Sequence, residues 1–280
     1  MITLILRLVR YKKLVVLFAA ASYVLGMALN ARAQQQDLLT ANGTGTVEVL
    51  AFGDSITYGV GDGEEPGAFV EESPLTDGTG GYPARLQTLG GFPVINDGVP
   101  GEQLVFQGVD RVPSAVQSST ANIVILYEGN NDAFNNVSDS VYGVELQRAI
   151  NVVKALGKTP VLVTLYPTCC NHAPEGQNIP GLDQQILDLS SVNSLSLVDL
   201  YHAWQTTCDT IPDCYLINMP EGLHPNSVGY DVIAQMMLAT LSGIDLFASD
   251  GAANLEAAFN LPTGTVIVKP DATPTPSSGD

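Results

Sequence analysis

The feature that most constrains the fold of this chain is a series of five short apolar runs, with helical patterns between most of them. The runs lie at residues 47–52, 93–96, 123–127, 161–165 and 195–200, and the helical patterns at 82–89, 142–156, 182–189 and 228–241. The runs are unbroken rather than alternating with polar residues, which is typical of parallel strands buried on both faces. This order predicts an α/β three-layer sandwich, in which a mostly parallel five-stranded sheet lies between two layers of helices.

A polar segment follows each of the first three predicted strands. Ser55 follows the first, Gly101 follows the second and Asn131 follows the third. Ligands of parallel sheets bind at the carboxyl ends of the strands. A serine there is a candidate nucleophile, a glycine lets the backbone approach a substrate, and an asparagine amide can donate to an oxyanion. Taken singly, each residue is equally explained by ordinary turn chemistry.

A nucleophilic serine needs a base, which is usually a histidine. The chain has three histidines, at His172, His202 and His224. Glu221 precedes His224 by three residues, so its carboxylate can fix the tautomer and orientation of that ring. His224 is therefore the best candidate for the base.

Four separated motifs resemble those of the SGNH hydrolases, the family of GDSL-type serine esterases and lipases. They occur in the family's order, between residues 47 and 241, and no single one is specific. The motifs are Gly53-Asp54-Ser55, Gly101 within N-x-G-x-x-G, Gly129-Asn130-Asn131-Asp132, and His224-Pro225-Asn226. Their joint order, each at a predicted strand end or helix start, is the signal.

The resemblance implies a flavodoxin-like sheet and a hydrolase that cleaves carboxylic esters through an acyl-enzyme. Ser55 would be the nucleophile and His224 the general base and acid. The backbone N–H groups of Ser55 and Gly101 and the side chain of Asn131 would form the oxyanion hole. The resemblance implies no metal and no organic cofactor. The expected partner is a small-molecule or polysaccharide ester substrate, and the sequence does not identify it.

One position departs from the family pattern, because the family usually has Asp where this chain has Glu221. Glutamate carries the same charge on a side chain longer by one methylene group and can still orient an imidazole. If Glu221 points away, Asp199, Asp213 or a backbone carbonyl takes its place.

The first 33 residues are typical of an export signal. A basic segment precedes an apolar run at 14–29, and Ala31-Arg32-Ala33 fits a cleavage site. A retained membrane anchor is the alternative, but the run is shorter than the ~20 residues that a spanning helix needs. We expect a secreted or extracytoplasmic protein, with cleavage after Ala33 and no stable membrane insertion afterwards.

The rest of the chain divides into three segments. Residues 34–45 form a flexible lead-in, 46–243 the SGNH hydrolase domain, and 244–280 a C-terminal extension with a Pro-, Thr- and Ser-rich tail. A further helix is expected at 252–259, and the tail is expected to begin at Pro262. Residues 61–81, rich in Gly, Glu, Asp and Pro, predict an exposed acidic loop.

The charge of the chain argues against polyanionic partners. Removal of residues 1–33 leaves 6 Lys and Arg against 29 Asp and Glu, a net charge of −23. Nucleic acids and anionic membranes bind basic surfaces, so this chain is not expected to bind either.

The chain has four cysteines, at Cys169, Cys170, Cys208 and Cys214. An even number in an exported chain suggests two disulfides, and three connectivities are open. Zinc binding is the alternative, but the paired C-x-x-C pattern is missing.

Two other functions compete with the esterase. A non-catalytic glycan-binding module on the same scaffold is suggested by Glu221 and the tail. A metal-dependent phosphoesterase would use Asp54, Asp132 and His224. The G-x-S-x-G motif of α/β-hydrolases is absent, since Thr57 stands where that motif needs glycine.

Four more side chains are considered for the pocket. Glu128 is expected to lie in solvent or to bond to backbone N–H groups. Tyr58, Phe69 and Tyr82 could line a substrate pocket, but aromatic side chains more often belong to the core.

Overall fold

The computed structural model describes residues 36–41, 46–72, 80–208 and 214–268. The predicted signal at 1–33, Asp213 and the end of the predicted tail lie outside the described residues. Part of the segment 34–45 is described. There Leu38–Ala41 form helix α2, and the Leu38 side chain is buried in the core.

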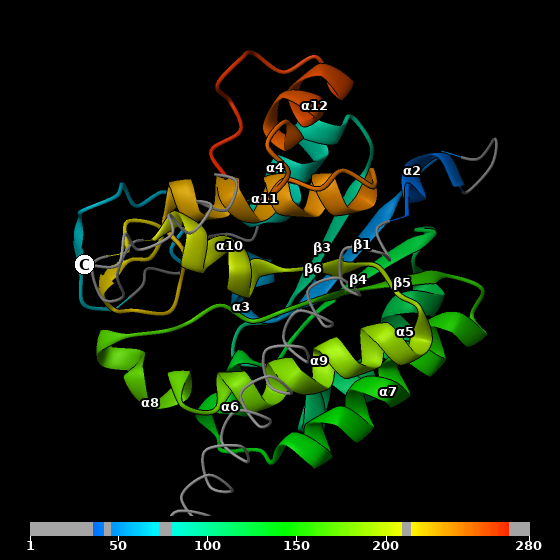
Figure 1. Ribbon diagram of the computed structural model, residues 1–280. Helices are drawn as coiled ribbons and strands as arrows, with labels where there is room; N and C mark the ends of the chain where they lie inside the picture. Colours follow the sequence, from blue (N-terminus) through cyan, green and yellow to red (C-terminus); the bar gives the residue numbers. More distant parts are fainter. Residues whose placement is uncertain (1–35, 42–45, 73–79, 209–213, 269–280) are drawn as a thin grey trace, which may run out of the picture. The chain divides into compact units, whose positions relative to one another are not determined.

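Five parallel strands form the central sheet, in the spatial order β3-β1-β4-β5-β6 (Figure 1). This is the strand order of flavodoxin-like folds, and it confirms the predicted fold class. The strands are β1 (Val49–Gly53), β3 (Val94–Gly98), β4 (Ile123–Tyr127), β5 (Thr159–Val163) and β6 (Leu197–Val198). Every residue of β1 and β4 is buried, which explains why their sequences are apolar throughout.

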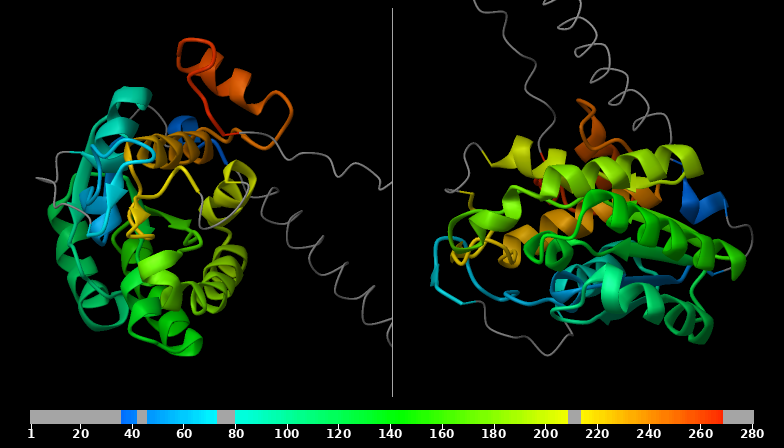
Figure 2. Two further views of the ribbon diagram at one scale, coloured as in Figure 1. Left: turned by 90° about the vertical axis from the view of Figure 1, so that its left-hand side faces the viewer. Right: turned by 90° about the horizontal axis from the view of Figure 1, so that it is seen from below.

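Helices cover both faces of the sheet (Figures 1 and 2). On one face α4 (Gly81–Gly90) packs against α11 (Ser227–Leu241), with α10 (Leu200–Thr207) beside α11. On the other face α7 (Asp139–Ala155) lies between α5 (Val109–Ser118) and α9 (Ile179–Asn193). The buried residues of α7 recur every three or four positions, so this helix buries one stripe.

The register of the sheet brings three strand ends to one edge. Gly53, the last residue of β1, pairs with Gly98 at the end of β3 and with Tyr127 at the end of β4. The loops that follow these strands therefore begin side by side. The motifs around Ser55, Gly101 and Asn131 lie in these loops or in the short helices α3 (Ser55–Tyr58) and α6 (Asn130–Phe134) that follow them.

A second, two-stranded parallel sheet pairs β2 (Phe69–Val70) with β7 (Met219–Pro220). The Glu221 amide extends the pairing by donating to the Val70 carbonyl at 3.0 Å. The acidic loop predicted at 61–81 is thus tied to the loop that contains Glu221 and His224.

The C-terminal extension packs on α11. Helix α12 (Gly251–Ala258) lies close to the range predicted for it, 252–259. A tail was expected to begin at Pro262, but the chain stays packed on the fold as far as Val268. Gln235 on α11 binds the backbone on both sides of Val266, donating to Thr265 at 3.0 Å and accepting from Ile267 at 2.9 Å. Val268 is buried.

One disulfide joins Cys208 and Cys214, whose Cα atoms are 4.9 Å apart. Cys169 and Cys170 remain as adjacent residues with their Sγ atoms 2.7 Å apart. None of the helices that the structure describes is both long enough and apolar enough to span a membrane.

Candidate active site

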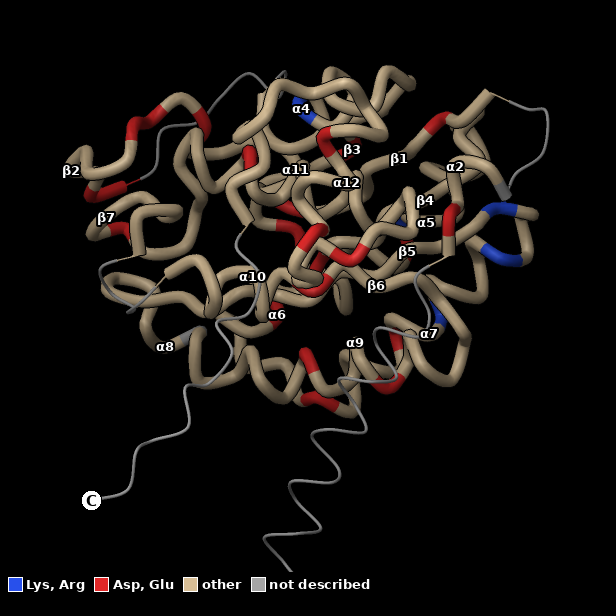
Figure 3. Tube along the Cα trace, turned by 45° about the horizontal axis from the view of Figure 1, so that its top comes forward, with Lys and Arg blue, Asp and Glu red and all other residues tan. Residues whose placement is uncertain are grey.

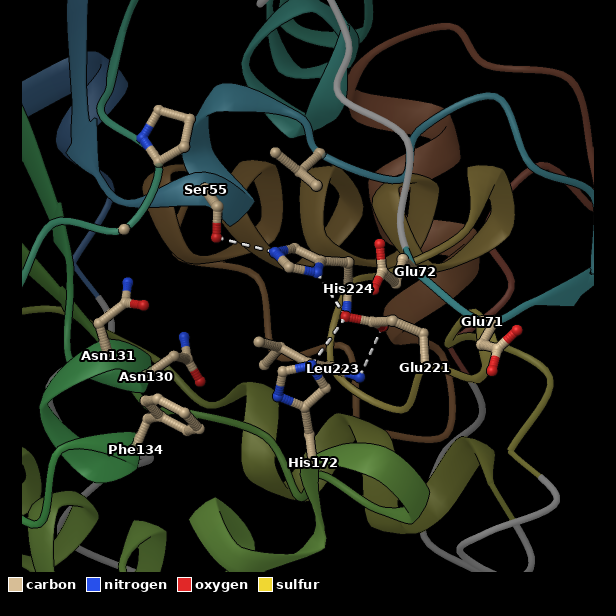
Figure 4. A pocket seen from close by; sticks show the side chains of 13 residues that line it. Ser55, Glu71, Glu72, Asn130, Asn131, Phe134, His172, Glu221, Leu223 and His224 are labelled. Atoms are coloured by element: carbon tan, nitrogen blue, oxygen red, sulfur yellow. Dashed lines mark hydrogen bonds and ion pairs between the residues drawn. The ribbon is translucent and has the colours of Figure 1, made fainter.

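A cavity of about 380 Å³ opens at the carboxyl edge of the sheet (Figure 4). Its walls come from segments far apart in the chain, as the sheet register dictates. The lining residues are Ser55, Val60, Glu71, Glu72, Pro100, Gly101, Asn130, Asn131, Phe134, His172, Glu221, Leu223 and His224.

A continuous line of hydrogen bonds joins three of these side chains. His224 Nε2 lies 2.8 Å from Ser55 Oγ, although the two residues are 169 positions apart. His224 Nδ1 lies 2.7 Å from Glu221 Oε1. Because the Nδ1–H donates to the carboxylate, Nε2 is left as the acceptor that faces the serine hydroxyl.

The Glu221 carboxylate is buried and held from several sides. Its Oε2 accepts the backbone N–H groups of Leu223 at 2.9 Å and His224 at 2.8 Å. Its Oε1 lies 3.3 Å from His172 Nε2 as well as close to His224. Burial alone raises a carboxyl pKa, but the hydrogen bonds from His172 and His224 outweigh it and hold the pKa of Glu221 well below its usual range. The acid is therefore ionised at neutral pH.

The alternative acids occupy other places. Asp199 caps α10, accepting the backbone N–H of His202 at 3.0 Å. His202 lies on that helix with its ring edge-on to Phe247, away from the cavity lining. Asp213 is outside the described residues.

Gly101 and Asn131 line the same cavity as Ser55. Gly101 has a φ of +79°, a conformation that L side chains rarely adopt. The Asn131 amide donates to the Glu102 carbonyl at 2.9 Å and, at a longer 3.5 Å, to Asp54 Oδ2. A side-chain amide carries two N–H donors, so a ligand in the cavity can take the one that makes only the longer contact to Asp54.

Four buried acidic side chains each stand within two residues of one that lines the cavity: Asp54, Glu102, Glu128 and Asp132. Asp54 caps α3 by accepting from the Ile56 amide at 2.9 Å. Burial raises the pKa of Asp54 to about 6, although the Ile56 hydrogen bond and the nearby His224 oppose the shift. Asp132 accepts the backbone N–H groups of Leu104 and Val105, which begin a short π-helix (Leu104–Gly108).

The expectation for Glu128 was wrong. Its side chain is buried, and neither carboxylate oxygen has a hydrogen-bond partner among the described residues. Burial raises its pKa well above the usual range, and the charges of Asp54 and Glu102 add to the effect. The surroundings of Glu128 therefore favour its protonated form.

The aromatic side chains considered for the pocket lie outside its lining. Tyr82 is fully buried and hydrogen-bonds Thr57 at 3.1 Å, Tyr58 is half-buried on α3, and Phe69 on β2 is exposed. The cavity instead contains Phe134, Asn130 and His172, which the sequence did not single out for it. Asn130 stands within the third motif and Phe134 two residues after it, so considering every position of that motif and two residues beyond it would have found both.

The carboxylates proposed for a phosphoesterase metal site, Asp54 and Asp132, each accept backbone N–H groups. In the part of the chain that the structure describes, no three His, Cys, Asp or Glu side chains are grouped as metal ligands.

The chain belongs to the GDSL-like lipase/acylhydrolase family, whose model matches residues 51–232. Fold and family together define a carboxylic-ester hydrolase. No curated protein matches the chain.

Solved structures share the fold. A lipase/acylhydrolase from Enterococcus faecalis is 20% identical, with a TM-score of 0.56 over 71% of this chain and 96% of that one. A member of the lipolytic G-D-S-L family from Veillonella parvula is 17% identical, with a TM-score of 0.55 over 69% and 97%. A catalytic mutant of an acetylxylan esterase from Geobacillus stearothermophilus is 20% identical, with a TM-score of 0.57 over 70% and 95%.

Proposed function

We propose that this chain is an exported serine esterase in which Ser55 is the nucleophile, His224 the general base and acid, and Glu221 the residue that orients His224. The observation that carries the proposal is the line of hydrogen bonds from Ser55 Oγ through His224 to Glu221, at 2.8 and 2.7 Å. The arrangement needs no metal or organic cofactor for ester cleavage.

Acylation begins when Ser55 Oγ attacks the ester carbonyl and its proton passes to His224 Nε2. The imidazolium that forms is stabilised by the Glu221 carboxylate, which remains ionised. His224 then returns the proton to the leaving alcohol, and the acyl group stays on Ser55. Glu221 cannot be protonated by His224 near neutral pH, because its own pKa is held so low.

The charge that develops on the carbonyl oxygen needs donors in the same cavity. We assign this role to the backbone N–H groups of Ser55 and Gly101 and to the Asn131 side chain. The left-handed turn at Gly101 and the fixed amide of Asn131 support the assignment. Donors fixed before the reaction cost no reorganisation when the oxyanion forms.

Deacylation repeats these steps with water in place of serine. His224 Nε2 removes a proton from the water, the hydroxide attacks the acyl carbon, and the proton returns to Ser55 Oγ. The carboxylic acid product then leaves.

The rim of the cavity supports a preference for neutral alcohols. Glu71 and Glu72 lie on the rim, and acidic residues occur on both sides of β2 (Figure 3). These carboxylates repel an ester whose alcohol part carries a negative charge, such as a phosphate group. We propose acyl groups on glycans or small esters as substrates. The fold shared with an acetylxylan esterase is compatible with this choice.

Export, with cleavage after Ala33, is proposed from the sequence of residues 1–33. Edman sequencing or mass spectrometry of the protein recovered from the culture medium of an expressing cell tests it. A mature chain that begins at Gln34 supports export, and an intact N-terminus in the membrane fraction contradicts it.

Two readouts on Ser55→Ala test the catalytic assignment. We expect hydrolysis of a short-chain aryl ester to fall roughly 10⁴-fold or more, because the nucleophile is removed. We also expect a fluorophosphonate probe to label the wild type and not the variant. Equal hydrolysis by both proteins refutes Ser55. A wild type that binds glycans but neither hydrolyses esters nor reacts with the probe is instead a binding module.

A further inference from the structure

The adjacent cysteines Cys169 and Cys170 form a cluster that ester hydrolysis does not use. Their Sγ atoms are 2.7 Å apart, closer than two sulfur atoms that are not bonded normally approach. The other two cysteines of the chain, Cys208 and Cys214, are already joined to each other. Cys169 and Cys170 are thus left as each other's only possible partner within one chain.

The backbone at this point is held in an unusual conformation. Cys170 has a φ of +58°, in the left-handed region that side chains rarely adopt. The turn is closed by a hydrogen bond from the His172 amide to the Cys169 carbonyl at 2.8 Å. Such outliers persist where the surroundings fix them, and they are common at functional sites.

The cysteine turn packs directly against the loop that carries Glu221. The Cys169 amide donates to the Gly222 carbonyl at 3.0 Å, and Cys169 Sγ lies 3.8 Å from Met219 Sδ. Gly222 has a φ of +89°, and a side chain there would collide with the Cys169 carbonyl. The two segments therefore fit together only because residue 222 is glycine.

The turn also places the second imidazole on the catalytic carboxylate. His172, two residues after Cys170, lies 3.3 Å from Glu221 Oε1 through its Nε2 atom (Figure 4). Thr168 Oγ1 donates to the His172 carbonyl at 2.9 Å and closes the same turn from its other end. His172 is thus tied to Cys169 and Cys170 within one short, hydrogen-bonded turn.

We propose that Cys169 and Cys170 form a vicinal disulfide, and that this bond holds His172 in contact with Glu221. The closed ring restricts the side-chain and backbone rotations of both cysteines, and this keeps the turn that carries His172 in place. His172 is then a positioning residue that acts through Glu221. The disulfide itself does not depend on the proposed function, whereas its effect on turnover does.

Ring closure is a thiol–disulfide exchange with an external disulfide, either oxidised glutathione or a thiol–disulfide oxidoreductase. Cys170 is the more exposed of the two, and its thiolate attacks the external disulfide and releases one thiol. The Cys169 thiolate then attacks Cys170 Sγ in the mixed disulfide and releases the second thiol. Two electrons and two protons pass from the cysteines to the external disulfide.

This bond should open more easily than the other disulfide. Cα atoms of adjacent residues are ~3.8 Å apart across a trans peptide, which is below the ~4.4–6.8 Å that disulfides usually span. The Cα atoms of Cys208 and Cys214, 4.9 Å apart, lie within that span. Strained disulfides are the labile ones.

Mass spectrometry after differential alkylation tests the bond. The protein is incubated with oxidised glutathione, denatured, alkylated and digested. We expect the peptide with Cys169 and Cys170 to carry no alkyl group and to be lighter than the dithiol by two hydrogen atoms. In a graded dithiothreitol series this peptide should become alkylated before Cys208 and Cys214 do. Alkylation of both cysteines without reductant, or two stable glutathione adducts, overturns the disulfide.

Turnover at a dithiothreitol concentration that opens only the vicinal bond tests the coupling. We expect kcat of the wild type to fall roughly fivefold, which is the effect expected from losing the free energy of one ordinary hydrogen bond. The double variant Cys169→Ala/Cys170→Ala and the single variant His172→Gln should show no response to the reductant. An unchanged kcat in the wild type, or a fall of equal size in the variants, overturns the coupling. If the esterase assignment itself fails, no redox state reacts with ester or fluorophosphonate, and the mass readout still decides the disulfide.

Discussion

The role of Glu221 in orienting His224 can be tested by changing its charge and its side-chain length separately. In Glu221→Gln the orienting group loses its charge, and kcat should fall roughly 10⁴-fold because the imidazolium is no longer stabilised. In Glu221→Asp the charge stays but the carboxylate withdraws from His224 Nδ1, which is 2.7 Å away in the wild type. A misplacement of about 1 Å costs on the order of 10²-fold. Ester hydrolysis kinetics measure both.

The matched control for these variants is Glu65→Gln, which removes an exposed carboxylate outside the cavity lining. It should leave kcat unchanged. If Glu221→Gln keeps a wild-type kcat, another group orients His224.

Asp54 should make the stability of the protein depend on pH. Burial raises its folded pKa from 3.8 to about 6, so the fold favours the protonated form. Its contribution to stability is complete below pH 4 and is lost as pH rises to about 6. Asparagine keeps the cap on Ile56 without a charge. Above pH 6, Asp54→Asn should therefore be more stable than the wild type by roughly 2–3 kcal/mol, at ~1.4 kcal/mol per pKa unit.

Urea unfolding at several pH values measures this difference. The two proteins should converge as the pH falls to 4. A gap of the same size at every pH would mean that the charge of Asp54 is not its cause.

The sequence located the residues of the candidate site that lie next to regular strands. Ser55, Gly101 and Asn131 follow strands whose ends the sheet register brings together, so their meeting could be predicted from the order of elements. His172 could not be found in this way. It lies in the irregular segment after β5, and its position depends on a turn whose Cys169 contacts Met219 and Gly222 rather than on a period in the sequence.

Among the elements, those with a strong period were predicted and the irregular ones were missed. Helix α5 was not predicted. Its buried Val109, Val112 and Val116 have helical spacing, but Pro113 argues against a helix interior. The pairing of β2 with β7 involves two residues on each strand, too few to produce any alternation. Such pairings are set by the tertiary contacts around them.

Arg111 joins α5 to β1, to β3 and to the loop after β3, and its replacement tests how these elements hold the site. The guanidinium binds both carboxylate oxygens of Glu102 at 2.8–3.0 Å, reaches Asp97 at 2.6 Å and lies 3.9 Å above the Phe52 ring. Lysine keeps the charge but not the planar fork. Arg111→Lys should cost roughly 2–3 kcal/mol of unfolding free energy, because Glu102 is left buried and only partly paired.

Thermal unfolding gives the stability change, and ester hydrolysis gives its effect on the loop that contains Gly101. Arg148→Lys is the control, since its pairs with Asp110 and Glu145 are exposed and should contribute little. Equal losses of unfolding free energy in the two variants would show that the pairing of Arg111 with Glu102 stabilises the protein no more than an exposed ion pair does.

At the scale of the whole domain, we expect the C-terminal extension to be a cover that the fold needs. Buried residues occur on every side of α11, so one of its faces needs a cover other than the sheet. The family match ends at residue 232, within α11, and the cover comes from beyond it. Leu246, Leu255 and Val268 of the extension are buried.

A pair of truncations tests this cover. A chain that stops after Gly243 loses those three buried side chains, each worth about 1.5–3 kcal/mol. The sum is comparable to the ~5–15 kcal/mol that stabilises a typical domain. We expect this chain to aggregate or to unfold at a much lower temperature. A chain that stops after Val268 keeps every described contact with α11 and should match the full chain in thermal unfolding. Equal stability of the two truncated chains would show that α11 does not need the extension.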